Sequence, residues 1–106
     1  PGQHWIALSI TVDTIFYFDS LNSWFHSNEC VAKFLIKMNK NVIINNIQIQ
    51  PDVSNLCGVH CIVFCHIMSK NNTLPVFQSF MNRLSQLDVF KREQLSLLYF
   101  KLTNMK

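Results

Sequence analysis

The chain has 106 residues, 49% of them hydrophobic and nine of them phenylalanine, which is enough for one hydrophobic core but not for two. No apolar run reaches the roughly 18–20 residues that a membrane-spanning helix requires, so a transmembrane helix is excluded. The formal net charge is +3, and we expect no signal peptide among the residues before the first motif. We therefore expect a single domain over residues 1–106.

The first predicted element is a β-hairpin. Residues 5–10 and 15–19 have the β-branched and aromatic composition of strands, and Thr-Val-Asp-Thr at 11–14 joins them. In an antiparallel hairpin the start of one strand lies beside the end of the next. The pattern therefore predicts that His4 and Asp19 meet at one rim of the sheet.

A polar loop over 20–28 leads into an amphipathic surface helix over 29–39. Its predicted apolar face comprises Cys30, Val31, Phe34, Leu35 and Met38, and its other face Lys33, Lys37 and Lys40. The next segment, 42–49, is rich in β-branched residues and contains neither glycine nor proline. It predicts a third strand that leads to Gln50.

The segment 57–69 is apolar on nearly all sides, which predicts a central buried helix with Ser54 and Asn55 as capping residues. After it, Pro75 suits the first turn of another helix, and Asp88 can cap a last helix. The predicted inner faces of these two helices are Val76, Phe77, Phe80, Met81 and Leu84, then Leu95, Leu98, Tyr99 and Leu102. The expected fold is α+β, with a small antiparallel or mixed sheet packed on the central helix and two C-terminal helices.

Cys57 has the setting of an activated thiol. Only the thiolate is a good nucleophile, and the free thiol pKa of roughly 8.5 leaves little thiolate at neutral pH unless the anion is stabilised. The predicted first helical turn offers unpaired backbone N–H groups and the positive end of the helix dipole. Gly58 leaves room for a substrate backbone beside the sulfur.

The remaining parts of an acyl-transfer site are also present. His4 is the expected general base and acid, because imidazole titrates closest to neutral pH. Asp19 is expected to orient it. Gln50, with the backbone N–H of Cys57, is expected to stabilise the oxyanion, although Gln48 competes for this role.

The four motifs follow in the order His4-Trp5, Phe18-Asp19-Ser20-Leu21, Gln50 and Cys57-Gly58-Val59-His60-Cys61. This order resembles the adenain-like and Ulp-like cysteine proteases, which include the adenovirus maturation protease and the SUMO-specific proteases. The resemblance runs from His4 to about Ser69. The interval from Gln50 to Cys57 is similar to that of the adenovirus enzyme and one residue longer than is usual in the SUMO proteases. This favours a viral or virus-derived transposon protease.

The resemblance implies a catalytic triad and an oxyanion-hole residue, here His4, Asp19, Cys57 and Gln50. It also implies that Trp5 packs beside the catalytic histidine. The glycine that often follows Asp-Ser-x in the family is Asn22 here, and asparagine tolerates the positive φ of such a turn. Family members carry several tens of residues before the histidine, so we expect this chain to lack its N-terminal part.

The function implied by the resemblance is a thiol endopeptidase that cleaves viral or virus-derived precursor proteins at small or Gly-rich sites. Removal of ubiquitin or a ubiquitin-like modifier remains an alternative, as do a catalytically incomplete remnant that acts as a binding module and an acyltransferase. The sequence does not require a cofactor. Activation by a peptide or by DNA remains an alternative, because the adenovirus enzyme that the chain resembles uses DNA as a cofactor. The expected partner is a polypeptide substrate, and no binding to a membrane is expected. A reducing intracellular setting is expected, in the host nucleus or virion if the protein is viral.

Several other side chains have a plainer reading. Cys57, Cys61 and Cys65 repeat every four residues on the predicted helix, too far apart to form disulfides comfortably. Cys61 and Cys65 are expected in the helix core. Zinc binding by His60 and His66 is disfavoured, because ligands strung along one helix cannot surround a tetrahedral ion.

The lysines and the spare acids and histidine complete the candidates. Lys33, Lys37 and Lys40 form either a solvated helix face or a weak nucleic-acid site. His26, in the polar loop, is expected to be solvated, with substitution for His4 as the alternative. Asp13 is expected to be a turn residue and Asp52 a loop residue, rather than parts of the triad.

Overall fold

The computed structural model describes residues 4–23 and 29–104. Three strands and four helices follow one another in these ranges: β1 (Ala7–Ile10), β2 (Thr14–Phe18), α1 (Glu29–Met38), β3 (Asn41–Ile44), α2 (Cys57–Lys70), α3 (Leu74–Ser85) and α4 (Val89–Asn104). The strands form one mixed sheet in the order β1-β2-β3, in which β2 pairs antiparallel with β1 and parallel with β3. The expected α+β fold is confirmed. None of the helices in the described ranges is long and apolar enough to cross a membrane.

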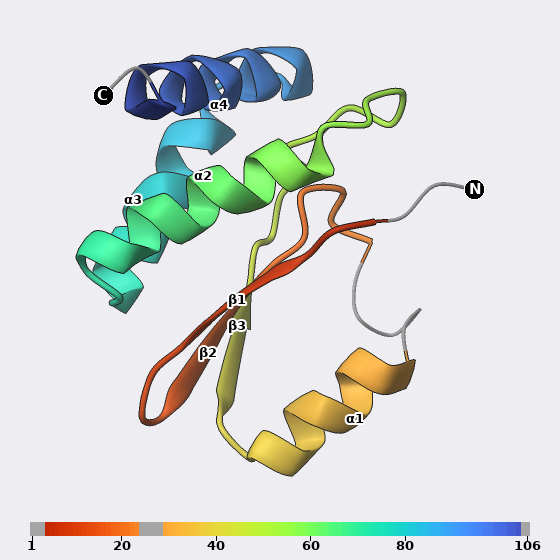
Figure 1. Ribbon diagram of the computed structural model, residues 1–106, viewed down its shortest axis with the longest axis vertical. Helices are drawn as coiled ribbons and strands as arrows, with labels where there is room; N and C mark the ends of the chain where they lie inside the picture. The colour runs from red at the N-terminus through yellow and green to blue at the C-terminus, as the bar shows by residue number, and fades with distance from the viewer. Residues whose placement is uncertain (1–3, 24–28, 105–106) are drawn as a thin grey trace.

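The sheet lies between two helical layers. Figure 1 shows α1 on one side, α2 and α3 on the other, and α4 stacked outside α2. Strand β2 is central, and its residues from Ile15 to Phe18 are all buried. Side chains alternate between the faces of a strand, so Phe16 and Phe18 pack toward α2 and α3 while Ile15 and Tyr17 pack toward α1. A strand covered on both faces is apolar throughout.

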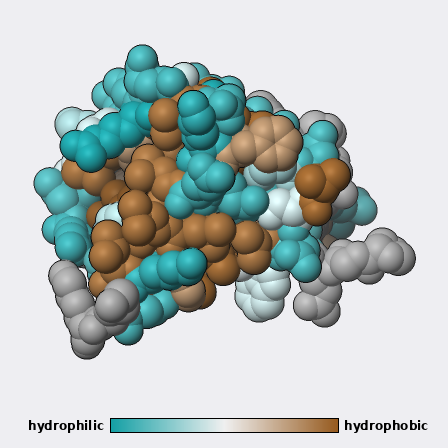
Figure 2. All heavy atoms as spheres, turned by 90° about the horizontal axis from the view of Figure 1, so that it is seen from above, coloured by the Kyte–Doolittle hydropathy of each residue, from teal (hydrophilic) through white to brown (hydrophobic). Residues whose placement is uncertain are grey.

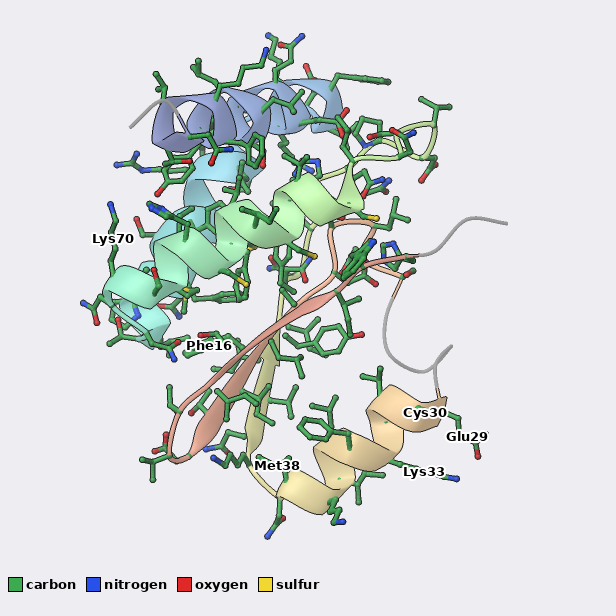
Figure 3. The ribbon with its side chains drawn as sticks, in the orientation of Figure 1. Phe16, Glu29, Cys30, Lys33, Met38 and Lys70 are labelled. Carbon is green, nitrogen blue, oxygen red and sulfur yellow. The ribbon has the colours of Figure 1, made fainter. Side chains whose placement is uncertain are left out.

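Aromatic contacts fix α2 and α3 against the sheet. The rings of Phe18 and Phe64 stack with centroids 4.8 Å apart, and Phe16 lies 5.3 Å from Phe77. Figure 3 shows Phe16 on the side of the sheet that faces α2 and α3. Phe18 ends β2 and Phe64 lies in the middle of α2. These contacts therefore fix the position of the end of β2 relative to the helix that begins at Cys57.

Strand β3 ends at Ile44, so the prediction of a strand reaching Ile49 is wrong over its second half. The Asn45 side chain accepts a hydrogen bond from Asp19 N at 2.9 Å and donates to Asp19 O and Ile47 O. These bonds replace the strand ladder. Beyond them, the N–H groups of Ile49 and Gln50 both donate to Ser20 O, at 2.8 and 2.9 Å. A loop tied to the end of β2, rather than a strand, therefore presents Gln50.

Helix α1 forms where predicted but is less deeply packed. Leu35 is its buried residue, whereas Phe34 is 40% exposed and Cys30 is also exposed. Figure 3 shows Glu29 and Lys33 on the side away from the sheet, and their charged groups are 3.5 Å apart. Lys40 lies beyond the end of α1, and its Nζ donates to Thr11 O at 2.6 Å. The predicted face of three lysines is therefore divided.

Helix α4 turns a different face inward from the one predicted. Leu95, Leu98 and Leu102 are 41%, 53% and 55% exposed, whereas Ser96 is buried. Viewed from the side of α4, the surface carries a broad group of hydrophobic side chains (Figure 2). Tyr99, the fourth residue of the predicted face, is partly buried. The leucine spacing correctly indicated a helix but not its orientation.

Candidate active site

The hairpin brings His4 and Asp19 together, as predicted. His4 Nε2 lies 2.6 Å from Asp19 Oδ1, and the His4 side chain is 31% exposed while that of Asp19 is almost fully buried. This contact assigns Nε2 to the carboxylate. Nδ1 is then the imidazole nitrogen left to exchange a proton with a thiol, which is the division of labour that a catalytic dyad requires.

The Asp19 carboxylate is held on all sides by donors. Besides the imidazole, Oδ1 accepts from Leu21 N at 3.0 Å, and Oδ2 accepts from both N and Oγ of Ser23, at 3.1 and 2.8 Å. Its backbone N and O are bonded to Asn45. A buried carboxylate with this many donors is fixed in orientation, so Asp19 presents one defined oxygen to His4.

Cys57 is the first residue of α2 and is buried, with 6% of its surface exposed. Its Sγ accepts a hydrogen bond from the backbone N–H of Trp5 at 3.4 Å. Trp5 adjoins His4 in the chain, so the segment that carries the base also contacts the sulfur. The sulfur therefore has a backbone donor beside it at the N-terminus of α2.

The start of α2 differs from the prediction that Ser54 or Asn55 caps it. The capping position is Leu56, which makes no side-chain capping bond. Ser54 Oγ instead accepts from Leu56 N at 3.2 Å and donates to Glu93. An uncapped helix start leaves its first N–H groups available to a ligand, which suits the oxyanion role expected of the Cys57 N–H.

Gln50 is buried and firmly oriented. Its Oε1 accepts from Ser20 Oγ at 2.6 Å, and its Nε2 donates to Ser54 O at 2.7 Å. A side-chain amide has two N–H protons, so the bond to Ser54 uses one of them. The second proton is the one that the oxyanion role requires.

The competing candidates are engaged elsewhere. The Gln48 amide donates to Gln50 O and to Asp52 Oδ1, both at 2.8 Å. Asp13 accepts from two threonine hydroxyls in the exposed hairpin turn. Asp13 and Asp52 therefore have the turn and loop roles expected of them. His26 lies outside the described residues.

The motif also includes Asn22, Gly58 and Trp5, which lie around the candidate site residues. Asn22 has φ of 55°, in the left-handed region that the family's glycine would favour. A Cβ added to Gly58 would meet Trp5 Cδ1 at 3.9 Å, so the indole lies beside the residue that follows the nucleophile. The predicted stacking of Trp5 on the His4 ring stays a prediction.

The other cysteines divide into two kinds. All four thiols are free. Cys61 is buried as predicted, and burial, helped by the neighbouring Cys57 and Cys65, raises its pKa to about 12. Cys65 is exposed, so the prediction that it lies in the core is wrong; partial burial of its sulfur still raises its pKa. The described residues include no cluster of three or more His, Cys, Asp or Glu side chains placed to hold a metal ion.

Both histidines of α2 bond to α4. His60 is buried; its Nε2 lies 3.0 Å from Glu93 Oε1 and its Nδ1 lies 2.9 Å from Ser96 Oγ. His66 Nδ1 lies 2.8 Å from the phenolic oxygen, Oη, of Tyr99. Neither Glu93 nor Ser96 was predicted from the sequence to bind a histidine of α2. The available signal was their spacing of three residues, which puts two polar groups on one face of a leucine-rich helix.

Acid is expected to weaken the native state through His60. Burial lowers the pKa of His60 below its ordinary value, against the opposing effect of Glu93. The unfolded chain therefore binds this proton more readily, so the contribution to stability is complete above a pH of about 6.5 and is lost as the pH falls from there through the folded pKa.

Urea denaturation at a series of pH values measures this effect. We expect the free energy of unfolding of the native chain to fall more steeply below a pH of about 6.5 than that of His60→Gln, which keeps polar groups but does not titrate. Equal slopes in the two proteins would contradict the assignment of a neutral, buried His60.

The described residues thus include a hydrogen-bonded His4–Asp19 pair, the Cys57 thiol at the start of α2 and the buried Gln50 amide on the loop before it. Comparison of the chain with protein-family models, with curated proteins and with solved structures finds no match.

Proposed function

We propose that this chain is a cysteine-type peptidase of the adenain-like and Ulp-like class. The proposal is supported above all by the 2.6 Å contact between His4 and Asp19, made where the neighbouring Trp5 N–H reaches the Cys57 sulfur. Base, orienting acid and nucleophile lie far apart in the sequence. Packing of a core alone would not require Asp19 to bind His4 next to the segment that contacts the Cys57 sulfur.

In the proposed reaction, the Cys57 thiolate attacks the scissile carbonyl while His4 holds the proton on Nδ1. The oxyanion that forms is stabilised by Gln50 Nε2–H and Cys57 N–H. Collapse breaks the C–N bond as His4 returns its proton to the leaving amine, which leaves a thioester on Cys57. Water, deprotonated by His4, then releases the acid and regenerates the thiol.

The proposed substrates are viral or virus-derived precursor proteins cut at small or Gly-rich sites, in a reducing compartment. Isopeptidase activity on a ubiquitin-like modifier is the alternative outcome. A peptide with a Gly-x-Gly site and a reactive ubiquitin-like probe, tested side by side on the native chain, separate the two.

Iodoacetamide labelling across pH tests the proposal without a known substrate. We expect Cys57 to be labelled rapidly well below a pH of about 8, and we expect this advantage to be lost in His4→Ala. Mass spectrometry identifies the modified residue. Cys30 and Cys65 are internal references, because both are exposed but neither has His4 and the start of α2 beside it.

Labelling that is slow at Cys57, or that favours Cys30 and Cys65 at every pH, would overturn the proposal. The fold would then be that of a catalytically incomplete binding module.

A further inference from the structure

The loop that carries Gln50 is fastened to α4 on both sides of that residue. Before Gln50, Gln48 O accepts from Arg92 Nη1 at 2.7 Å. After it, Ser54 Oγ donates to Glu93 Oε1 at 2.5 Å. Arg92 and Glu93 are adjacent near the start of α4, which Figure 1 shows outside α2 and away from the sheet. Helix α4 thus holds the loop on both sides of Gln50.

Both anchors are themselves rigid. Arg92 Nε also donates to Leu84 O at 2.8 Å, which ties it to α3. Glu93 Oε1 lies 3.0 Å from Nε2 of the fully buried His60. A carboxylate can only accept, so Nε2 carries the proton and Nδ1 accepts from the Ser96 hydroxyl. Glu93 of α4 is therefore fixed in position by its bond to His60 of α2, whose ring is in turn held by Ser96.

Ser54 connects this anchor to the amide of Gln50. The carbonyl of Ser54 accepts from Gln50 Nε2 at 2.7 Å, and its hydroxyl is the group that Glu93 binds. His60 follows Cys57 by one turn of α2. The positions of Cys57 and of the Gln50 amide thus both depend on α2. Cys57 belongs to this helix, and the amide is connected to its His60 through Ser54 and Glu93.

We propose that Glu93 and Arg92 are positioning residues that hold the loop over 48–54 so that the Gln50 amide is aimed at the oxyanion. The proposal rests on the proposed function and adds to it that the oxyanion hole depends on α4. Displacing an oxyanion donor by a fraction of an ångström weakens transition-state binding while leaving substrate binding and thiol activation intact.

A double-mutant cycle between Glu93→Ala and Gln50→Ala is the main test. We expect Glu93→Ala alone to lower kcat on the order of tenfold with KM little changed, and to have almost no further effect once Gln50 is alanine. Gln94→Ala, an exposed neighbour on the same helix, is the matched control. A tenfold loss in both backgrounds would overturn the proposal, because it would show a general structural effect.

Removing Glu93 leaves His60 without its acceptor and can destabilise the fold. Glu93→Gln and Ser54→Ala are milder variants, and we expect smaller losses of kcat in the same direction. Glu93→Gln keeps an acceptor oxygen for Ser54 and His60, whereas Ser54→Ala removes the bond to Glu93 and the acceptor of Leu56 N but leaves the His60–Glu93 bond in place. Labelling of Cys57 by iodoacetamide is expected to be unchanged in both, since the His4–Asp19 pair does not involve these groups. Altered labelling would show that the effect is not confined to the oxyanion hole.

Hydrogen exchange separates failure of this inference from failure of the proposed function. The amides of Gln50, Ser54 and Leu56 are all hydrogen-bonded, and we expect their exchange to accelerate in Glu93→Ala and not in Gln94→Ala. Unchanged exchange would overturn the positioning role whatever the activity. Accelerated exchange in a chain that cleaves no substrate would instead retain the anchor and reject the peptidase.

Discussion

Replacing Asp19 with asparagine is expected to lower kcat by about four orders of magnitude, the loss that follows when a triad acid no longer fixes the histidine tautomer. Oδ1 accepts from His4 and Leu21, and Oδ2 accepts twice from Ser23. An amide has one oxygen and one NH2 group, so it places a donor against donors in either orientation.

Each orientation has a separate consequence. If the amide NH2 faces His4, Nε2 must become an acceptor, and the proton then sits on Nδ1 where the thiol needs a base. If the NH2 faces Ser23, it opposes the Ser23 N–H, while the Ser23 hydroxyl can turn to accept; because Ser23 is exposed, the cost in the free energy of unfolding is expected at the low end, about 1 kcal/mol. Catalysis is lost in the first case and stability in the second.

The measurement combines peptide hydrolysis, labelling of Cys57 across pH and urea denaturation of the same preparation. Asp13→Asn is the matched control, because Asp13 is an acid of the same hairpin that lies in its exposed turn. We expect the control to retain both activity and rapid labelling. A folded Asp19→Asn protein that keeps kcat within about tenfold of the native value would contradict this prediction, because it would show that an amide oxygen orients His4 as well as the carboxylate does.

The parts of the site that were predictable depend on short-range geometry. A hairpin puts its two outer ends together whatever it packs against, so the meeting of His4 and Asp19 followed from the strand pattern. The placement of Cys57 at a helix start followed in the same way from the apolar run after it. The positive φ of Asn22 was likewise predictable from a local turn.

The parts that failed depend on contacts between distant residues. Val42–Ile49 has strand composition throughout, but Asn45 satisfies the backbone of Asp19 with its side chain and so ends β3 at Ile44. Helix α4 exposes its leucines because His60, a buried polar group on α2, needs Glu93 and Ser96. Burying an unpaired imidazole costs more than exposing part of a leucine, and no local pattern reports that competition.

The second large effect is expected from Gln50→Ala, which should lower kcat by about a hundred- to a thousandfold through the loss of one oxyanion donor. Iodoacetamide reacts by displacement at a saturated carbon and forms no oxyanion, so labelling of Cys57 should stay rapid in this variant. Loss of hydrolysis with retained labelling is the signature that separates an oxyanion residue from the Cys–His pair. The substitution also leaves Ser20 Oγ and Ser54 O without their partner, so the unfolding transition must be measured on the same sample.

Gln48→Ala is the matched control, since both glutamines precede Cys57 on the same loop and in the sequence only their spacing from Cys57 favoured Gln50. Its amide binds Gln50 O and Asp52 rather than pointing to an open site, so we expect a much smaller loss of kcat. Equal losses in the two variants would mean that the loop as a whole, and not the Gln50 amide, is required. A larger loss in Gln48→Ala would transfer the oxyanion role to Gln48. It would also contradict the proposed anchor, because it is the Gln50 amide that donates to the Ser54 carbonyl.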